Sequence, residues 1–181
     1  MQTMTKHKPK PCDSRKNNVT ELVMKLGSRS GMERQHARET LVRLGEPAMG
    51  PLIAALSADR TVVRWEAAKA FTELPAPAAA AALVKTLMDE DGDVRWLAAE
   101  ALCGLREKGL PPLFEALMVR TDSIELREGA HHVFHALNRD DLADIVGPVL
   151  ATLERYEPEL AVPFSAEEAL AKLKQRDSRR S

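Results

Sequence analysis

The fold of this chain is decided by one stretch, GDVRWLAAEALCGL at residues 92–105. Its small and aliphatic residues recur every three or four positions, at Val94, Ala98, Ala101, Leu102 and Leu105. At 3.6 residues per turn these positions share one face of an α-helix. The stretch therefore predicts a helix that is buried along this face, where the alanines let a second helix approach closely.

The same pattern occurs four times. Each copy has an arginine, an alanine three residues later, a large apolar residue seven later and a leucine ten later. The arginine–alanine pairs are Arg34 with Ala37, Arg64 with Ala67, Arg95 with Ala98, and Arg127 with Ala130. The arginines are 30, 31 and 32 residues apart. Repeats of this length are typical of an α-solenoid, in which neighbouring helix pairs stack into a continuous core.

A second helix follows a short break in each repeat. Its apolar residues are spaced four apart, at Leu52 and Leu56, Leu83 and Leu87, Leu113 and Leu117, and Val149 and Leu153. The glycine or asparagine found in three of the breaks suits a left-handed residue that ends a helix. In the fourth second helix, Pro148 predicts a kink or a break.

The two ends of the chain read differently from the repeats. Residues 1–17 are polar and basic, which predicts a disordered tail, and a short helix is expected from Asn18. A last helix is expected from Ser165, with Glu168 completing the capping pattern, as a polar cap on the stack. We therefore predict a repeat domain over residues 18–176 and a disordered tail at 177–181.

The composition excludes several classes of protein. No apolar run reaches the length of about 18 residues that a membrane helix needs, and the N-terminus has no apolar signal segment. The two cysteines, Cys12 and Cys103, do not make a disulfide framework, so we expect a reducing, cytoplasmic setting. The net charge of −1 combines a charge of +4 on each end with −9 on residues 19–171. An acidic body repels phosphate backbones, which disfavours a nucleic-acid groove.

The repeat also resembles a known family. Residues 93–102, read as DVRWLAAEAL, resemble the short HEAT-like repeats of the phycobilisome-lyase type, and residues 41–56 resemble the hinge and second helix of the same repeats. The resemblance covers about residues 19–156. It implies an all-α superhelix, a HEAT-like solenoid of about four helix pairs with a C-terminal capping helix. Because the family includes bilin-attaching lyases, iron-binding hydroxylases and binding scaffolds, the resemblance leaves the function open.

The arginine column has two readings. Four arginines in a row suit an anionic ligand, but acidic residues lie just upstream of each, at Glu33, Asp59, Asp91, Asp93 and Glu125. An arginine at the start of a helix can bind such carboxylates, or the carbonyls of the turn before it. We therefore interpret the column, and the alanine column beside it, as structural.

Two tryptophans share a column of their own. Trp65 and Trp96 directly follow the arginines of the second and third repeats, on the side of the helix away from the predicted core. An exposed tryptophan is a favoured anchor for a protein partner. The alternative, that both pack against neighbouring repeats or loops, stays open at this point.

Residues with catalytic or metal-binding chemistry are sparse. His131 and His135, beside His132, have the i, i+4 spacing of two metal ligands, but no carboxylate ligand is obvious. The iron-binding hydroxylases of the HEAT-like family use repeated His-Glu dipeptides, which this chain lacks. No phosphate loop or nucleophile–base motif occurs, and Cys103 takes a packing position of the repeat. We predict no catalytic residue, no metal and no cofactor.

These observations favour a non-catalytic scaffold that binds another protein. The partner is expected on the curved surface of the second helices, at residues off the leucine stripe: Lys85, Asp89, Glu115, Met118 and Arg155, together with the two tryptophans. One alternative, which the family resemblance alone implies, is a bilin lyase-like enzyme or chromophore-binding protein. Another is a HEAT-like DNA-binding protein, against which the acidic body speaks.

Overall fold

A computed structural model of the chain describes residues 11–139, 141–155 and 157–180. Every regular element in this part of the chain is helical. The elements are α1 (Pro11–Lys25), α2 (Gly31–Leu44), α3 (Glu46–Ala55), α4 (Thr61–Glu73), η1 (Pro77–Ala79), α5 (Ala80–Thr86), α6 (Gly92–Leu105), η2 (Arg106–Gly109), α7 (Leu110–Val119), α8 (Ile124–Leu137), α9 (Ala143–Leu153) and α10 (Pro158–Arg180).

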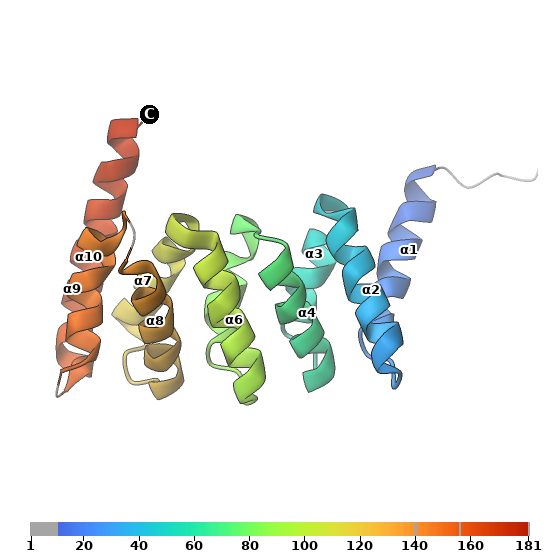
Figure 1. Cartoon of the computed structure of the whole chain (residues 1–181), viewed down its shortest axis with the longest axis horizontal. Coiled ribbons are helices and arrows are strands. Elements are labelled where there is room, and N and C mark those ends of the chain that lie inside the picture. Colours follow the sequence, from blue (N-terminus) through green and yellow to red (C-terminus); the bar gives the residue numbers. More distant parts are fainter. Residues whose placement is uncertain (1–10, 140, 156, 181) are drawn as a thin grey trace, which may run out of the picture.

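The helices are stacked in two layers that run along the length of the molecule (Figure 1). The helices that begin with the arginine column, α2, α4, α6 and α8, pack side by side in one layer. In the other layer α1 packs beside α3, and α5 beside α7. This arrangement confirms the predicted all-α solenoid.

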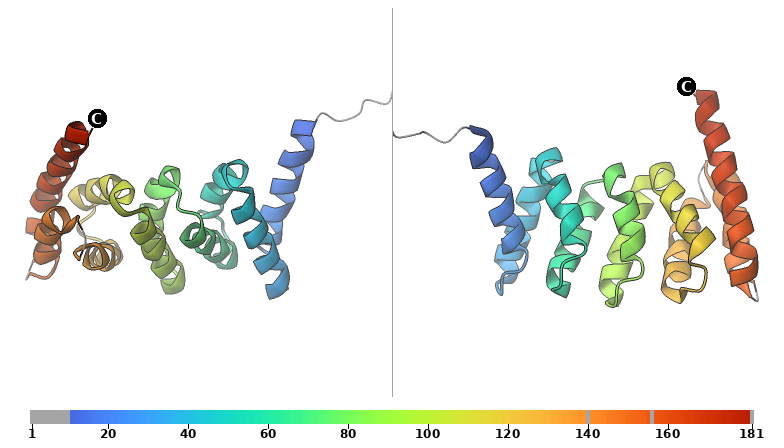
Figure 2. Two further views of the ribbon diagram at one scale, coloured as in Figure 1. Left: turned by 45° about the horizontal axis from the view of Figure 1, so that its top comes forward. Right: turned by 180° about the vertical axis from the view of Figure 1, so that it is seen from behind.

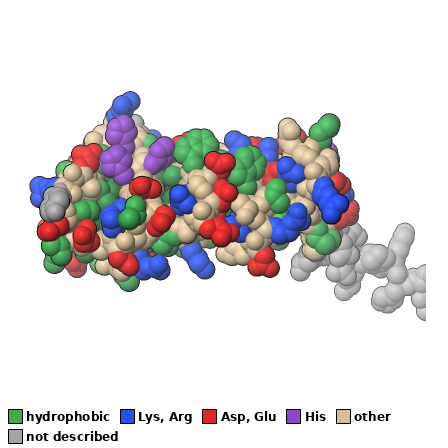
Figure 3. Space-filling model, turned by 90° about the horizontal axis from the view of Figure 1, so that it is seen from below, with side chains coloured by type: hydrophobic (Ala, Val, Ile, Leu, Met, Phe, Trp, Pro, Cys, Tyr) green, Lys and Arg blue, Asp and Glu red, His purple; other side chains and the backbone are tan. Residues whose placement is uncertain are grey.

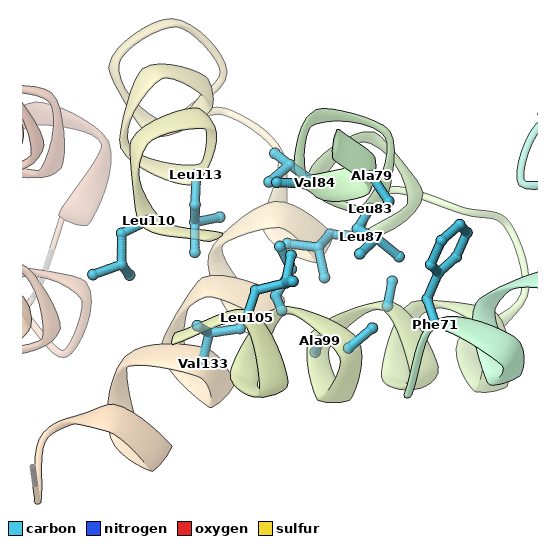
Figure 4. Close-up of a cluster of buried hydrophobic side chains, with 14 of the residues drawn as sticks. Phe71, Ala79, Leu83, Val84, Leu87, Ala99, Leu105, Leu110, Leu113 and Val133 are labelled. Carbon is cyan, nitrogen blue, oxygen red and sulfur yellow. The ribbon is translucent and has the colours of Figure 1, made fainter. Parts of the chain in front are cut away.

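The repeat columns build the core between the layers. The alanines of the column, at positions 37, 67, 98 and 130, are all 0% exposed, as are Leu41, Leu102 and Phe134. Figure 4 shows Leu87 just after α5, Leu105 of α6 and Leu113 of α7 within one buried cluster. Small residues in the first helices and leucines in the second helices therefore fill the same interior, as the periodicity predicts.

Local chemistry sets several helix ends. The side chain of Asp91 accepts hydrogen bonds from the backbone N–H groups of Asp93 and Val94 at the start of α6, and Ser30 and Ser123 cap α2 and α8. Gly45 has φ of +64° in the first break, as expected for a glycine that ends a helix. The prediction of a left-handed residue is wrong for Asn138, whose backbone is right-handed. In the third break Arg106, and not Gly109, has a positive φ.

Both terminal helices are longer than the sequence pattern indicates. The first begins at Pro11 rather than Asn18, and α10 begins at Pro158 rather than Ser165 and continues to Arg180. Residues 1–10 and 181 of the predicted tails lie outside the described residues. Ser165 lies inside α10 and therefore caps no helix. Its hydroxyl lies 2.8 Å from the hydroxyl of Thr152 and joins α10 to α9.

The predicted break at Pro148 is absent, and α9 runs continuously through this residue. Pro148 is the sixth residue of α9, so the helix loses one hydrogen bond near its start while the following turns remain intact. Pro163 occupies the same place in α10. There, the carbonyl of Glu159 that the proline leaves free accepts a hydrogen bond of 3.4 Å from the hydroxyl of Thr121.

The C-terminal end departs from the order of the repeats. Helix α9 packs against α8, whereas α10 packs against both α7 and α9, so α10 fills the place beside α7 that a fourth second helix would occupy. It runs antiparallel to α7, because Glu159 lies near Thr121 after α7 and Arg176 lies 3.8 Å from Glu107 before it. The last turns of α10 project beyond the stack (Figure 1).

Replacing Ala98 by leucine tests the packing between the layers. Because Ala98 is 0% exposed in α6, the larger side chain is expected to overpack the core and reduce the free energy of unfolding by about 1–3 kcal/mol. Urea denaturation measures this change. The matched control is Ala81→Leu on the exposed side of α5, for which a change within about 0.5 kcal/mol is expected. Equal stability of the two variants would contradict the packing.

Candidate functional site

The arginine column holds the turns between the repeats. Each guanidinium donates a hydrogen bond to the backbone carbonyl six residues upstream: Arg34 to Ser28 (3.0 Å), Arg64 to Ala58 (3.0 Å), Arg95 to Asp89 (2.9 Å) and Arg127 to Thr121. These carbonyls belong to the turn just before each first helix, and satisfying them fixes the path of the chain into that helix.

Arg64 also links its own turn to the next one. It is only 7% exposed, and its guanidinium binds both carboxylate oxygens of Asp89 (2.7 and 3.0 Å) and one of Glu90 (2.8 Å). The hydrogen bond to Asp89 raises the pKa of Arg64 above its ordinary value. A planar, two-pronged donor suits this site, because it binds a carboxylate and a carbonyl at once.

Arg34 makes a similar link between the first two repeats. It reaches Glu66 in α4 at 3.1 Å, and Arg38 binds the same carboxylate at 2.6 Å. The acidic partners of Arg34 and Arg64 therefore come from the following repeat and not from the acids upstream. The turn carbonyls, which are the other partners expected for the column, are bound by all four arginines. A glutamate such as Glu66 on the buried side of a first helix is the signal that sequence reasoning missed.

The predicted partner-binding residues on the second helices differ in their exposure. Asp89 forms an ion pair with Arg64, and its side chain is only 8% exposed. Its carboxylate is therefore not free to bind a partner. Lys85 is exposed and borders the same small hollow as Asp89. Glu115 is exposed on α7, Met118 is half-buried against the core, and Arg155 is exposed beyond the end of α9.

The two tryptophans have different surroundings although they share a column. Trp96 is 55% exposed on α6, whereas Trp65 is half-buried and packs against the core. Trp65 therefore contributes to packing between the helices, whereas Trp96 presents much of its indole ring to solvent. On the same side of α6, one turn further along, lies Glu100, whose carboxylate oxygen is 2.7 Å from Nε2 of His132 in α8.

The histidines of α8 join neighbouring helices. Besides the contact of His132 with Glu100, His131 lies 3.1 Å from Glu154 at the end of α9, and the rings of His131 and His135 stack with centroids 6.1 Å apart. Figure 3 shows histidines gathered at one end of a face that also carries apolar side chains and both signs of charge. No group of three metal-ligating side chains meets among the described residues.

The thiol of Cys103 is poorly suited to act as a nucleophile. Burial, and then the nearby charge of Glu100, raises its pKa to about 12. At neutral pH almost none of the thiol is ionised, and the thiolate is the reactive form. This residue packs against the core.

The hollows on the surface are open to solvent. One of about 470 Å³ lies between α8, the end of α9 and the start of α10, and is bordered by Ile124, Arg127, Glu128, His131, Leu153 and Pro158. A hollow of this kind can receive a side chain of a partner, whereas cofactor sites usually enclose most of their ligand.

A stack of helix pairs, in which each pair contacts only its neighbours, defines the class of α-solenoid repeat proteins. A family model of HEAT repeats matches residues 19–103. Residues 19–103 therefore carry HEAT repeats, and the chain folds as a HEAT-like solenoid. This agrees with the family resemblance that the repeat motif carries.

One solved structure shares this fold, and two others are similar over less of their geometry. The complex of CpcE and CpcF of phycocyanin lyase from Nostoc sp. PCC7120 is 21% identical with a TM-score of 0.59, over 84% of this chain and 98% of that chain. An engineered protein is 20% identical (TM-score 0.41, 92% and 85% covered), and a designed armadillo repeat protein is 21% identical (TM-score 0.42, 87% and 87% covered). Comparison with curated proteins gave no match.

Among the described residues, no helix is long and apolar enough to cross a membrane.

Removing the guanidinium of Arg64 tests its role in the turns. Arg64→Ala leaves the carboxylate of Asp89 without its cation, and we expect a loss of about 3–5 kcal/mol in the free energy of unfolding. Glu90→Ala is the control, because this partner is 78% exposed and its loss is expected to cost no more than about 1 kcal/mol. Chemical denaturation measures both, and equal effects would contradict a special role for Arg64.

The reactivity of Cys103 provides a second test. In a Cys12→Ser variant, alkylation of the folded chain at pH 8 is expected to be roughly a hundredfold or more slower than that of the denatured chain, because the raised pKa removes the thiolate. The rate should increase with pH up to the limit of folding. Similar rates in the folded and denatured chains would show that the thiol is accessible and ionised.

Proposed function

We propose that this chain is a non-catalytic scaffold that binds another protein through the first-helix face around Trp96. The observation that supports this most is the 55% exposure of Trp96. The core of α6 is built by other residues, among them Val94, Leu97 and Ala98, so the stack does not need an indole at this position. A large, rigid and partly apolar side chain at the surface is a typical anchor of a protein interface.

The surroundings of Trp96 also suit a protein partner. Glu100 and His132 lie on the same face and bridge α6 to α8, which provides a polar and rigid border beside the indole. Interfaces commonly combine an aromatic anchor with a polar rim. This face replaces the second-helix surface as our proposed site, because Asp89 of that surface is taken up by Arg64.

The absence of catalysis is a proposal that rests on the chemistry of the available groups. The pKa of Cys103 is raised, and His131 and His132 are each within 3.1 Å of a glutamate on another helix. The hollow next to His131 is open rather than enclosing. None of these groups is arranged as a nucleophile with a base beside it.

Capture of partners from an extract of the native host tests the proposal. We expect a bound protein that Trp96→Ala loses and that Trp65→Phe and Met32→Ala retain. Met32 is the matched control because it is 84% exposed but lies in the first repeat, away from α6. All variants should unfold within about 1 kcal/mol of the wild type, since Trp96 and Met32 are exposed and the change at Trp65 is conservative. Unchanged capture by Trp96→Ala would contradict the proposed site.

Bilin binding is the second candidate, because the fold is similar to that of a phycocyanin lyase complex. Absorption spectra of a bilin with and without the purified chain separate the two proposals. We expect the free spectrum of the bilin to be unchanged, since the hollows described above do not enclose a ligand. A spectral shift that disappears when the chain is unfolded would favour the chromophore-binding alternative.

A further inference from the structure

The outer side of α10 exposes large apolar residues. Leu160 is 65% exposed and Phe164 is 70% exposed, whereas Val162, Ala166 and Leu173 on the opposite side are buried against α7 and α9. The last helix of a solenoid usually presents a polar surface to solvent. Figure 2 shows α10 at one end of the stack of described helices. We call this side, which runs from Leu160 through Phe164, Glu168 and Ala171 to Lys174, the outer face of α10.

Charges are separated along this face. The exposed acids, Glu167 and Glu168, lie before Ala171, and the exposed lysines, Lys172 and Lys174, lie after it. In the part of the chain that the structure describes, none of these four has an ion-pair partner. The ion pairs of α10 to Glu107 and Asp141 come from Arg176, which projects from a different side of the helix.

We propose that two copies of this chain form a two-fold symmetric dimer by pairing the outer faces of α10 in antiparallel orientation. If the helices cross at Ala171, residues equally far from it on the two helices oppose one another. Glu168 then faces Lys174 of the second copy, and symmetry forms this pair twice. A parallel arrangement would place like charges together, so the charge pattern selects the antiparallel one.

The remaining residues of the face fit the same arrangement. Ala171 at the crossing is small, which allows the two helices to approach closely. Phe164 reaches the C-terminal half of the other helix, where the alkyl chains of Gln175 and the guanidinium of Arg179 provide an apolar and cationic surface for an aromatic ring. The dimer therefore covers Phe164, the most exposed of the large apolar residues of α10. Trp96 lies on α6, away from this face, so the dimer is independent of the proposed binding of a partner.

Sedimentation equilibrium of the full chain over roughly 1–500 μM tests the dimer. The wild type is expected to show a concentration-dependent mass between one and two chains. Glu168→Lys is expected to weaken the dimer by roughly tenfold or more, because two attractive pairs become repulsive. Adding Lys174→Glu to Glu168→Lys should restore it. The control is Glu46→Lys, an equal change of charge on the exposed start of α3 at the other end of the stack.

A wild type that remains monomeric throughout this range would overturn the proposal, and so would a double variant no stronger than Glu168→Lys. Circular dichroism spectra and melting temperatures should be the same for all variants, since both substituted positions are exposed.

Disulfide formation tests the geometry independently. In the Cys12→Ser background, Ala171→Cys should form a covalent dimer under mild oxidation, because only residues at the crossing bring their Cβ atoms within about 4.5 Å. Ser178→Cys, which is also exposed on α10 but about two turns from the crossing, should form it much more slowly. Equally fast cross-linking at both positions would contradict the antiparallel crossing at Ala171.

Discussion

The structure depends on the hydrogen bonds that the arginine column makes to the turns between repeats. A helix pair alone cannot bury its apolar face, so each pair must stack on the next at a fixed distance and angle. At Arg64 one buried guanidinium binds the carbonyls of its own turn and the carboxylate of Asp89 in the next turn. The spacing of two repeats is thereby fixed by one side chain, and the alanine column can pack without gaps.

Much of this fold is predictable from the sequence, because the first-helix motif recurs at a nearly constant spacing along the chain. The burial of Ala37, Ala67, Ala98 and Ala130 follows directly from the columns. A periodic pattern predicts which face of a helix is buried, but it does not predict which other helix that face packs against. Helix α10, and not α9, lies beside α7. This placement depends on contacts between residues far apart in the sequence, such as Thr121 with Glu159, which no local pattern encodes. For the same reason the sequence pattern points to an acidic partner just upstream of Arg34, whereas the structure places this partner 32 residues downstream, in α4.

The exposure of the candidate site residues is also not predictable from the repeat pattern. Trp65 and Trp96 are equivalent in the repeat, yet only Trp96 is largely exposed. The wheel position of a residue gives its direction from the helix, whereas its exposure depends on the neighbouring side chains, which differ between repeats. Residues that follow the repeat build the stack, so specific functions are expected where the repeats differ: at Trp96 on the first-helix face and at Leu160 and Phe164 on α10.

Arg64 binds the turns before two successive first helices and so couples the two repeats into one cooperative unit. Native-state hydrogen exchange of the wild type and of Arg64→Lys tests this coupling most directly, because lysine keeps the charge but cannot bind the two turns at once. The account predicts that the amides of α4 and α6 lose protection together in the variant, while those in α8 change little. Unchanged protection of α4 and α6, or a loss confined to the turn itself, would contradict it.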